Sequence, residues 1–512
     1  MSDDGSRVSD SLLSRRIRQV IALDPGATAL SFDGMTFRWR FYSDAVADLE
    51  SLLAAHPGSR RVGIVLRNRP GPLAALIAVI GSGRAVVTLS PHLGDVGLAR
   101  DIVDLAPDVI VAEDEDWARD AVLAAVEAIG AIALRAGTDR ALAAQPVGWS
   151  PHPARRQPGD VAVLMMTSGT TGSPKRVELT YDRMAAAFRA AGLALDEMHE
   201  PRLRRGTDIL WASLVHISGL YFAITHAIEG RSIALLEKFE VGAWAELVSR
   251  HRPLYVRLAP TAMRMVLRAE VPVETFGCVR AVGSGTALLP PELAEAFEDR
   301  YGIPVLGTYG ATEFAGAIAG WTLKDKQQWG QSKRGSVGRA HHGIDLRIVD
   351  PDTGDVLPFG EAGLLEARGG QLPGSDGAWV RTTDLASVDG DGFLFIHGRA
   401  DDAINRGGFK IPPGVLEDAL LAHPAVDEAC AVGLPDPRLG EVPVVAVTLV
   451  GPATEEELME YLASRLTSYQ RPLAIKVVDQ LPRTPSLKVS RPLVRMRFFS
   501  GRTPQGPESP RE

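Results

Sequence analysis

The chain has 512 residues, of which 45% are hydrophobic and 23% are charged, and its formal net charge is −8 at pH 7. This composition is typical of a globular protein, and the length predicts about two to four domains or subdomains. The mild negative charge is spread along the chain, so we expect neither nucleic acid nor an anionic membrane as a partner. Cys278 and Cys430 lie far apart with no His or Cys at ligand spacing, so neither a zinc site nor a disulfide framework is indicated.

The amino terminus, MSDDGSRVSD, is polar and acidic, unlike an ordinary signal peptide. The longest apolar stretch, PLAALIAVIG, is much shorter than the roughly 20 residues that a membrane span requires. We therefore expect a cytoplasmic protein without a membrane segment, either a monomer or a homodimer.

From about residue 60, short β-rich runs alternate with segments of helical period. The first strands expected are VGIVL, AVVTLS and VIVAE, separated by helices over PLAALIAVIGSG and GLARDIVDLA. After residue 175 we expect a helix over YDRMAAAFRAAGLAL and then strands over ILWASL, SIALLE, YVRLAP, VRAVGSG and VLGTYG. This alternation predicts parallel sheets covered by helices. Ligands bind beyond the carboxyl ends of such strands, so the segments that follow VLMM, WASL, RAVG and VLGT are joint candidates for one crevice.

From about residue 335 the expected strands are short and separated by Gly, Asp and Pro turns, which predicts antiparallel pairing or a small distorted β-barrel. Beyond Arg399, helices over GVLEDALLAH and EEELMEYLASRL accompany strands over ACAVGL, VVAVTLV and IKVVD. We expect an α/β protein with a large N-terminal domain over 1–398, whose barrel-like subdomain covers about 335–398. A smaller C-terminal α+β domain over 399–500 and a disordered tail over 501–512 complete the prediction.

Residues 165–175, MMTSGTTGSPK, directly follow the apolar run VAVLMM and predict a strand that leads into a phosphate-sized loop. Glycine lets backbone N–H groups approach phosphate oxygens closely, and the neighbouring Ser and Thr hydroxyls add donors. The loop is not a Walker loop, because the spacing from Gly169 to Lys175 differs and Pro174 removes a backbone donor. Taken alone, the segment is also consistent with a flexible surface linker.

Four further segments follow this loop in order: YGATE (309–313), RTTD (381–384), GRADDAINRGGFK (398–410) and PRTPSLK (482–488). Together the five motifs resemble the adenylate-forming superfamily of acyl-CoA ligases, luciferases and peptide-synthetase adenylation domains. Five motifs at compatible spacing over nearly the whole chain are far more specific than one glycine-rich loop. The resemblance implies an acid–thiol ligase that makes a CoA thioester from a small carboxylic acid by way of acyl-AMP. It also implies ATP or acyl-AMP, CoA and Mg²⁺ as ligands, and a small domain that moves against the large one.

The resemblance assigns roles to residues in each motif. Four are implied to act in catalysis: Lys488, Glu313, Thr312 and His216. The implied nucleotide site consists of Thr167, Ser168, Gly169, Thr170, Thr171, Gly172, Lys175, Gly283, Ser284, Gly285, Tyr309, Gly310, Asp384 and Arg399. Mg²⁺ is implied to bind Glu313 and Thr170. The implied CoA channel consists of Gly407, Gly408, Phe409 and Lys410, which reach the adenylate when the small domain rotates about a hinge at Asp401.

Each implied role agrees with the chemistry of its side chain. The Tyr309 ring offers an aromatic face for adenine, and the Asp384 carboxylate can accept hydrogen bonds from both ribose hydroxyls. A carboxylate and a phosphate repel each other, so the Lys488 ammonium is expected between them. Judged alone, Asp384 is equally consistent with a turn cap, Glu313 with an exposed loop acid, His216 with a packed core histidine and RGGF with a hairpin turn.

Two positions depart from the family pattern. Arg176 stands where the family normally has glycine after the loop lysine, and Leu487 stands where a glycine usually precedes the catalytic lysine. If that glycine has a positive φ, leucine there is strained by about 1–3 kcal/mol. One hypothesis is that ATP-dependent adenylation is weak or lost, so that a separate enzyme supplies acyl-AMP. The alternatives are a fully competent ATP-dependent acid–CoA ligase, an adenylation enzyme that loads a carrier protein, and a non-catalytic binding protein.

Overall fold

The computed structural model describes residues 10–152, 160–167, 175–374, 377–400, 402–407, 409–484 and 488–499. These residues form two compact units. The first unit comprises the described residues up to 345 and those of 367–380. The second comprises 346–366 and the described residues from 381 onward. The boundary expected between residues 398 and 399 stays a prediction. No helix in the described ranges is long and apolar enough to span a lipid bilayer.

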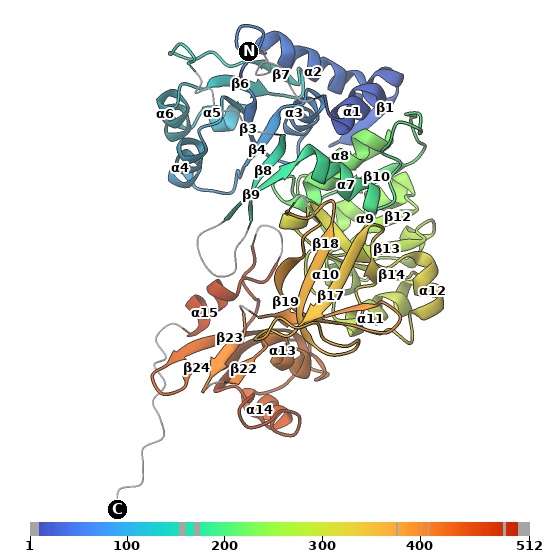
Figure 1. Cartoon of the computed structure of the whole chain (residues 1–512), viewed down its shortest axis with the longest axis vertical. Coiled ribbons are helices and arrows are strands. Elements are labelled where there is room, and N and C mark those ends of the chain that lie inside the picture. Colours follow the sequence, from blue (N-terminus) through green and yellow to red (C-terminus); the bar gives the residue numbers. More distant parts are fainter. Residues whose placement is uncertain are drawn as a thin grey trace, which may run out of the picture. The chain divides into compact units, whose positions relative to one another are not determined.

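A seven-stranded sheet forms the amino-terminal part of the first unit (Figure 1). In spatial order its strands are β7 (Leu142–Ala144), β6 (Ile132–Ala136), β5 (Val109–Ala112), β3 (Arg61–Val65), β4 (Ala85–Leu89), β8 (Val161–Thr167) and β9 (Lys175–Thr180). The inner strands pair in parallel, and β7 and β9 pair antiparallel with their neighbours at the two edges. The predicted helix-covered sheet of mostly parallel strands is therefore confirmed.

Successive residues of these strands contact two different layers of helices. Val62 and Ile64 pack in one apolar cluster, whereas Val65 and Ile110 pack in another. The first cluster includes helices α1 (Leu12–Leu23), α2 (Arg40–Leu52) and α3 (Pro70–Gly81). The second includes α4 (Asp95–Leu105), α5 (Asp114–Trp117) and α6 (Asp120–Ala128). Figure 1 shows the two groups on opposite sides of the sheet, as strand periodicity requires.

Helix α3 lies at the centre of the first cluster, and every one of its residues is buried. Its sequence, PGPLAALIAVIG, is apolar on all sides, which is the pattern of a helix enclosed by protein. It starts at Pro70, where the missing N–H would have no partner within the helix. Helices α1, α2 and α8 (Ile217–Glu229) surround it. The apolar run is therefore a buried core helix, as its length predicted.

Two further sheets complete the first unit. One has the strand order β10 (Thr207–Leu210), β11 (Ser232–Leu235), β1 (Thr28–Phe32) and β2 (Met35–Arg38). The other has the order β12 (Tyr255–Arg257), β13 (Ala281–Ser284), β14 (Val305–Ala311), β15 (Gly316–Gly320) and β16 (Arg339–Ala340). Helices α9 (Val241–His251), α10 (Pro260–Arg268) and α11 (Pro291–Tyr301) share an apolar cluster with this second sheet. The four segments expected at one crevice thus leave three different sheets.

Some elements differ from the expectation. Helix α7 (Tyr181–Ala190) is shorter than the predicted run, because Gly192 has a φ of 81° that an α-helix cannot continue. Strand β10 ends at Leu210, before the residues WASL. The amino-terminal elements α1, β1, β2 and α2 were not predicted, because the strand and helix alternation is clear only from about residue 60.

Asn68 joins the seven-stranded sheet to the sheet that contains β10 and β11. Its Nδ2 lies 3.1, 3.0 and 3.1 Å from the carbonyl oxygens of Trp211, Ala212 and Leu236. Its Oδ1 accepts the backbone N–H of Leu214 at 2.9 Å. The side chain is only 4% exposed, so the amide itself must find its partners within the protein. One amide therefore fixes the segment that leads from β10 to α8.

The second unit begins with a sheet of β17 (Ile344–Val349), β18 (Gly363–Gly369), β19 (Val380–Val388) and β20 (Leu394–Arg399), most of whose residues belong to this unit. β19 and β20 pair antiparallel, as the Gly- and Asp-rich turns predicted. The next sheet contains β22 (Phe409–Ile411), β21 (Ile404–Arg406), β24 (Gly440–Leu449) and β23 (Val426–Asp436), and β25 (Ala474–Val477) pairs with β24.

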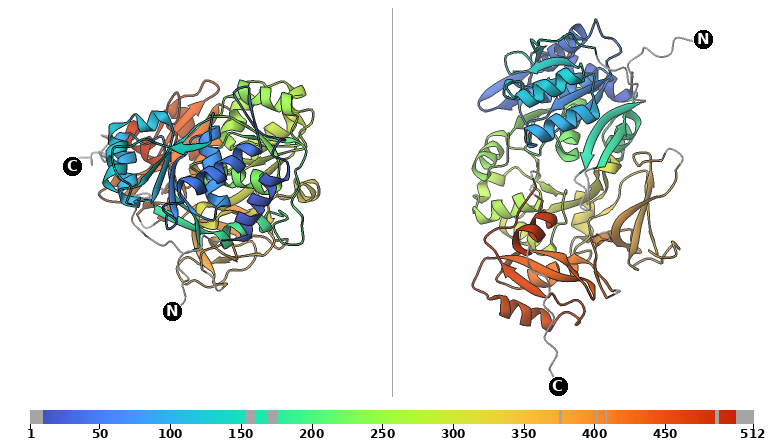
Figure 2. Two further views of the ribbon diagram at one scale, coloured as in Figure 1. Left: turned by 90° about the horizontal axis from the view of Figure 1, so that it is seen from above. Right: turned by 90° about the vertical axis from the view of Figure 1, so that its left-hand side faces the viewer.

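Helices cover both faces of this last sheet (Figure 2). Helices α13 (Pro413–Leu421) and α14 (Glu455–Ala463) share a cluster with Ala431 and Val445 on one face. Helix α15 (Arg491–Phe499) shares a cluster with Cys430 and Val444 on the other. Helix α15 was not predicted, and it buries the second face of the small α+β fold.

A buried histidine lies in the amino-terminal core. His226 on α8 is 2% exposed and stacks on Trp39, with ring centroids 5.0 Å apart. Its Nδ1 lies against the carbonyl oxygen of Arg231, so Nδ1 carries the proton and Nε2 accepts from the Tyr42 hydroxyl at 3.2 Å. Burial lowers the pKa of His226 to about 4 from its ordinary value of 6.5. The imidazole is therefore neutral in the folded protein at neutral pH.

Because the folded protein binds this proton less readily than the unfolded chain, His226 makes folding stability fall as the pH decreases from about 6.5 towards 4. We expect this residue to remove about 2 kcal/mol of unfolding free energy between pH 7 and pH 5. Urea unfolding at the two pH values should show a smaller pH dependence in His226→Gln than in the wild type. Equal pH dependence of the two proteins would contradict the assignment.

Replacing Asn68 with Ala leaves three partly buried carbonyls and one buried N–H without this partner. We expect Asn68→Ala to lower the free energy of unfolding by about 3–5 kcal/mol, measured by urea denaturation. The matched control is Asn405→Ala, because Asn405 is exposed and should change stability by less than about 0.5 kcal/mol. Similar losses in the two variants would show that the Asn68 hydrogen bonds do not stabilise the fold.

Candidate active site

The YGATE motif forms the turn between β14 and β15. Gly310 is required there, because a Cβ at this position would lie 2.2 Å from the carbonyl oxygen of Gly316. The register of the two strands shifts between Tyr309 and Gly310, and a short 3-10 helix, η2 (Thr312–Phe314), follows. Glu313 is exposed, and Tyr309 and Thr312 are partly exposed. The turn thus presents an aromatic ring, a hydroxyl and a carboxylate close together at the end of a strand.

Two buried or half-buried side chains hold the backbone of this turn. The Arg183 guanidinium on α7 donates to the carbonyl oxygen of Glu313, and also to that of Gln371 at 3.1 Å. Gln371 is fully buried, and its Nε2 donates to the carbonyl oxygens of Phe314 and Ala317 at 2.8 and 3.1 Å. Because backbone oxygens take up these donors, the side chains of the motif are not needed to stabilise the turn.

The GSGT segment ends β13 on the neighbouring strand. Thr308 Oγ1 on β14 donates to the carbonyl oxygen of Ser284 at 3.3 Å, and a Cβ on Gly285 would lie 2.5 Å from that Thr308 oxygen. Gly283 contacts the Tyr255 hydroxyl so closely that a Cβ would lie 1.7 Å from it. Thr286 has a φ of 72°, a left-handed conformation that is strained for a β-branched residue. The segment therefore turns sharply away from the sheet beside the YGATE motif.

His216 is the residue before the first turn of α8 and is partly exposed. The choice between a residue beside the acyl group and a packed core histidine stays a prediction. Gly219 lets the first turn of α8 contact the preceding segment, since a Cβ there would lie 2.2 Å from the carbonyl oxygen of Ser213. The Asn68 amide fixes the same segment through Leu214. Local backbone contacts thus set the position of His216.

The phosphate loop connects β8 and β9. Thr167 and Lys175 are the last register pair of these strands, and Met166 pairs with Arg176. The Arg176 guanidinium lies 3.4 Å from the Asp101 carboxylate on α4. The predicted site residues Ser168, Gly169, Thr170, Thr171 and Gly172 lie outside the described residues, and so do the side chains of Thr167 and Lys175.

In the second unit, Asp384 on β19 and Arg399 on β20 are direct register partners. Opposite residues of an antiparallel pair lie about 5 Å apart, so the structure brings the backbones of these two predicted ribose contacts together. The Thr382 hydroxyl accepts from the Asp384 N–H at 3.0 Å, and Arg399 donates to the Thr383 hydroxyl at 2.7 Å. Asp384 lies within a strand, so the alternative of a turn cap is wrong.

Lys488 ends a tight connection whose two sides are joined by a bridge between Arg483 and Val489. The Thr484 N–H donates to the Lys488 carbonyl oxygen at 2.8 Å. Arg483 pairs with Glu428 on β23 at 2.6 Å, and Arg491 pairs with Glu417 on α13 at 2.7 Å. These ion pairs hold both ends of the connection to the small α+β fold, and the Lys488 side chain is exposed. Leu487 lies outside the described residues.

The predicted CoA segment is a β-hairpin. Asn405 pairs with Lys410 and Arg406 pairs with Phe409. Gly407 has a φ of 58°, as a tight hairpin turn requires. The Phe409 ring is 55% exposed and stacks on Tyr469 with centroids 4.5 Å apart. The alternative of a hairpin is therefore correct for the fold, and a role in CoA binding stays a prediction. Gly408, the Lys410 side chain and the hinge residue Asp401 lie outside the described residues.

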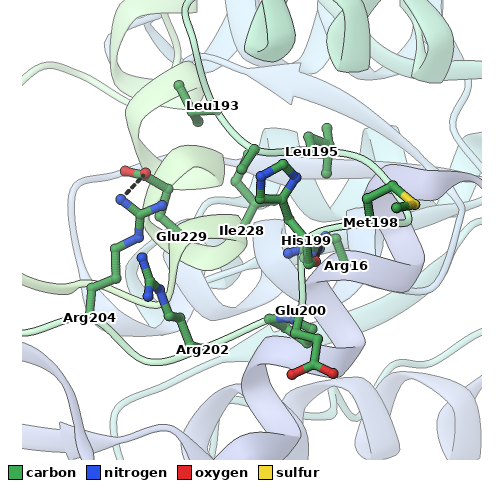
Figure 3. A pocket seen from close by; sticks show the side chains of 12 residues that line it. Arg16, Leu193, Leu195, Met198, His199, Glu200, Arg202, Arg204, Ile228 and Glu229 are labelled. Atoms are coloured by element: carbon green, nitrogen blue, oxygen red, sulfur yellow. Dashed lines mark hydrogen bonds and ion pairs between the residues drawn. The ribbon is translucent and has the colours of Figure 1, made fainter.

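A hollow of about 360 Å³ lies elsewhere in the first unit, between α1, the segment 193–204 and the end of α8 (Figure 3). Arg16 donates to the carbonyl oxygens of Asp196 and His199 at 2.7 and 2.6 Å. Arg204 pairs with Glu229 at 3.0 Å, as Figure 3 shows. None of the predicted site residues lines this hollow. Arg16 and Arg204 are thus engaged with groups of the protein.

Sequence reasoning missed the residues that support the site. Asn68 had a detectable signal, because it is a polar residue between the strand VGIVL, which ends at Leu66, and Pro70, which starts the next helix. Arg183 and Gln371 had none, since their partners are distant in sequence. Such contacts follow from the tertiary structure.

Comparison with known proteins identifies the family. The sequence matches AMP-binding enzyme over residues 17–373 and AMP-binding enzyme C-terminal domain over residues 415–488. It is 29% identical to 4-coumarate–CoA ligase 3 of Oryza sativa subsp. japonica, over 93% of this chain and 90% of that protein. It is 31% identical to 2-succinylbenzoate–CoA ligase of Bacillus velezensis, over 92% of this chain and 95% of that protein.

The fold is similar to the solved structure of o-succinylbenzoate CoA synthetase from Bacillus subtilis in complex with its acyl-adenylate intermediate. The TM-score is 0.75 at 26% identity, and the match covers 94% of this chain and 98% of that chain. These findings confirm the resemblance to the adenylate-forming superfamily and the prediction of an enzyme whose relatives are acid–thiol ligases. This chain belongs to the AMP-binding enzyme family.

Proposed function

We propose that the protein makes a CoA thioester from a small-molecule carboxylic acid by way of an acyl-AMP intermediate. The observation that carries this proposal is the register pair of Asp384 and Arg399, predicted from two separate motifs to bind one ribose. A carboxylate and a guanidinium from opposite positions of two strands would provide an acceptor and donors for the two ribose hydroxyls. The names of the relatives, which are CoA ligases, support the same chemistry.

In the proposed first half-reaction, a carboxylate oxygen of the acid attacks the α-phosphorus of ATP and the bond to pyrophosphate breaks. The two reactants carry like charges, so the Lys488 ammonium between them would lower the barrier. The Thr312 hydroxyl would donate to the α-phosphate, and the Tyr309 ring would lie against adenine. The glycines and hydroxyls of 167–175 would hold the β- and γ-phosphates.

Residues for Mg²⁺ are compatible with this proposal. Glu313 has an exposed carboxylate, which is the hard oxygen ligand that Mg²⁺ prefers. Phosphates and water normally complete such a site. When bound, Mg²⁺ would neutralise charge on the phosphates.

In the proposed second half-reaction, the CoA thiolate attacks the acyl carbon and the bond to the AMP oxygen breaks. We propose that the small domain rotates about Asp401, withdraws Lys488 and presents the hairpin from Asn405 to Lys410 to the adenylate. The glycine tip of this hairpin leaves space for the pantetheine arm. A carrier-protein thiol is the alternative acceptor, and comparing it with free CoA would discriminate between the two.

The half-reactions differ in how well this chain matches the family pattern. The two departures from the family pattern, Arg176 and Leu487, both lie in motifs assigned to adenylation. We therefore keep the hypothesis that ATP-dependent adenylation is weak or lost. In that case a separate enzyme supplies the acyl-AMP. The ion pair between Arg176 and Asp101 gives Arg176 a structural role that needs no phosphate, which favours the alternative of a fully competent ligase.

The two half-reactions can be measured separately. With a panel of aliphatic and aromatic acids, Lys488→Ala should lower ATP-dependent pyrophosphate release about 100- to 1000-fold, because a cation at the developing charge is removed. Thioester formation from synthetic acyl-AMP and CoA should change little. The control is Lys324→Ala, because Lys324 is an exposed lysine on α12 (Leu323–Trp329). A wild type that makes no thioester from acyl-AMP would refute the proposed function.

Restoring the family glycines tests the second hypothesis. If Arg176 or Leu487 weakens adenylation, Arg176→Gly or Leu487→Gly should raise pyrophosphate release at least about tenfold, since a displacement of about 1 Å in a reacting group can cost on the order of a hundredfold in rate. Thioester formation from acyl-AMP should be unaffected in both variants. Rapid adenylation by the wild type that neither substitution changes would refute the hypothesis of weak or lost adenylation. The remaining alternative would be a fully competent ATP-dependent ligase.

A further inference from the structure

Arg257 is the last residue of β12, at the carboxyl end of the five-stranded sheet. It is in register with Gly283 on β13. Residues in register on parallel strands share a face, so Arg257 and Gly283 point to the same side of the sheet. Their neighbours Val256 and Val282 point to the other side, where they are buried in the cluster with α9, α10 and α11. Arg257 therefore points away from that core.

Arg257 lies beside two segments that carry predicted site residues, the GSGT segment and the start of α8. Its guanidinium carbon lies 3.5 Å from the ring centroid of Phe222 and 5.1 Å from that of Tyr255. Phe222 lies on α8, which begins directly after His216. The Trp211 indole N–H, on the segment that leads to His216, donates to the Arg257 carbonyl oxygen at 2.9 Å. Arg257 is thus a cation between the GSGT strand and the His216 helix.

The positive charge of Arg257 is incompletely matched by the protein. The side chain is partly buried, and no carboxylate of the described residues lies within ion-pair distance of it. Asp208 on β10 is the acid that feels its charge, together with that of Arg231. Burial raises the pKa of Asp208 above its ordinary value despite both arginines, so its negative charge is poorly stabilised.

The other nearby acid is already engaged. Glu229 pairs with Arg204 at 3.0 Å and with Arg231 at 3.2 Å. Arg204 and Arg231 thus share Glu229, and Asp208 is the carboxylate left opposite Arg257, beyond ion-pair distance. An aromatic ring beneath a guanidinium leaves the guanidinium edge available for a second partner.

We propose that Arg257 is a specificity-determining residue that selects acids carrying a second anionic group, a carboxylate or a sulfonate, in addition to the carboxylate that reacts. This inference rests on the proposed function, because it takes the acid to lie between His216 and the GSGT segment. The guanidinium would form two parallel hydrogen bonds with the second group. An acid with a neutral end would leave the cation unmatched and displace its water, and would therefore react more slowly.

The test compares pairs of acids that differ only in the second group: glutarate with valerate, adipate with hexanoate, and terephthalate with 4-methylbenzoate. The measured quantity is kcat/KM for CoA-thioester formation. We expect the wild type to favour the diacid by about 10- to 100-fold in at least one pair, the range of a charge-assisted hydrogen bond. Arg257→Met, which keeps the length and removes the charge, should reduce that ratio to about one, mainly by raising KM for the diacid.

Two control variants separate recognition from stability. Arg257→Lys keeps the charge and should retain part of the preference, although it loses the planar fork. Arg280→Met removes an exposed arginine just before β13 and should leave both the ratio and the activity unchanged. A wild type that prefers the monocarboxylate in every pair would overturn the inference. So would an Arg257→Met variant that slows both members of a pair equally, because this result indicates a merely structural role.

The failure of the proposed function would be visible in a separate experiment. If no acid reacts with ATP, the synthetic adenylates of terephthalate and 4-methylbenzoate are each given to the wild type and to Arg257→Met with CoA. If the wild type prefers the terephthalate adenylate and the variant does not, the inference is supported for an enzyme that forms thioesters but does not adenylate. Thioester formation without a preference overturns the inference alone, and no thioester from either adenylate overturns the proposed function together with it.

Discussion

The candidate site in the first unit depends on the buried amide of Asn68. This side chain is the hydrogen-bond partner of four backbone groups that follow strands of a different sheet. Unpaired, such groups would each cost about 1–3 kcal/mol, so the two sheets are held in one arrangement. The segment fixed in this way leads directly to His216 and α8, which carries Phe222. A structural amide therefore sets where His216 and Phe222 lie.

The same device recurs at the YGATE turn, where Arg183 and Gln371 donate to backbone oxygens. Glycine and an irregular strand register make the sharp turn possible, but they leave carbonyls without a regular partner. Because distant side chains satisfy those carbonyls, Thr312 and Glu313 need not stabilise the turn. Functional groups are thereby available for a ligand without loss of stability.

In the second unit, ion pairs fix the backbone around Lys488. Arg483 with Glu428 and Arg491 with Glu417 attach both ends of a short connection to a strand and a helix of the small fold. If Lys488 has the proposed catalytic role, such a rigid base helps, because an error of about 1 Å is costly in rate. The base is internal to this unit, so the lysine would be carried with it in any rotation.

The sequence by itself determined the helix-covered parallel sheets, the buried helix α3, the small α+β fold and the five motifs of the family, because periodicity, turn residues and motif spacing are local properties. It did not reveal α15 or the amino-terminal elements, whose patterns are weak. Only the tertiary structure decided that Asp384 lies opposite Arg399, that Asn68, Arg183 and Gln371 support the turns, and that Arg257 lies over Phe222. These contacts join residues far apart in the chain, and their partners are fixed by packing and by the need to pair every buried polar group.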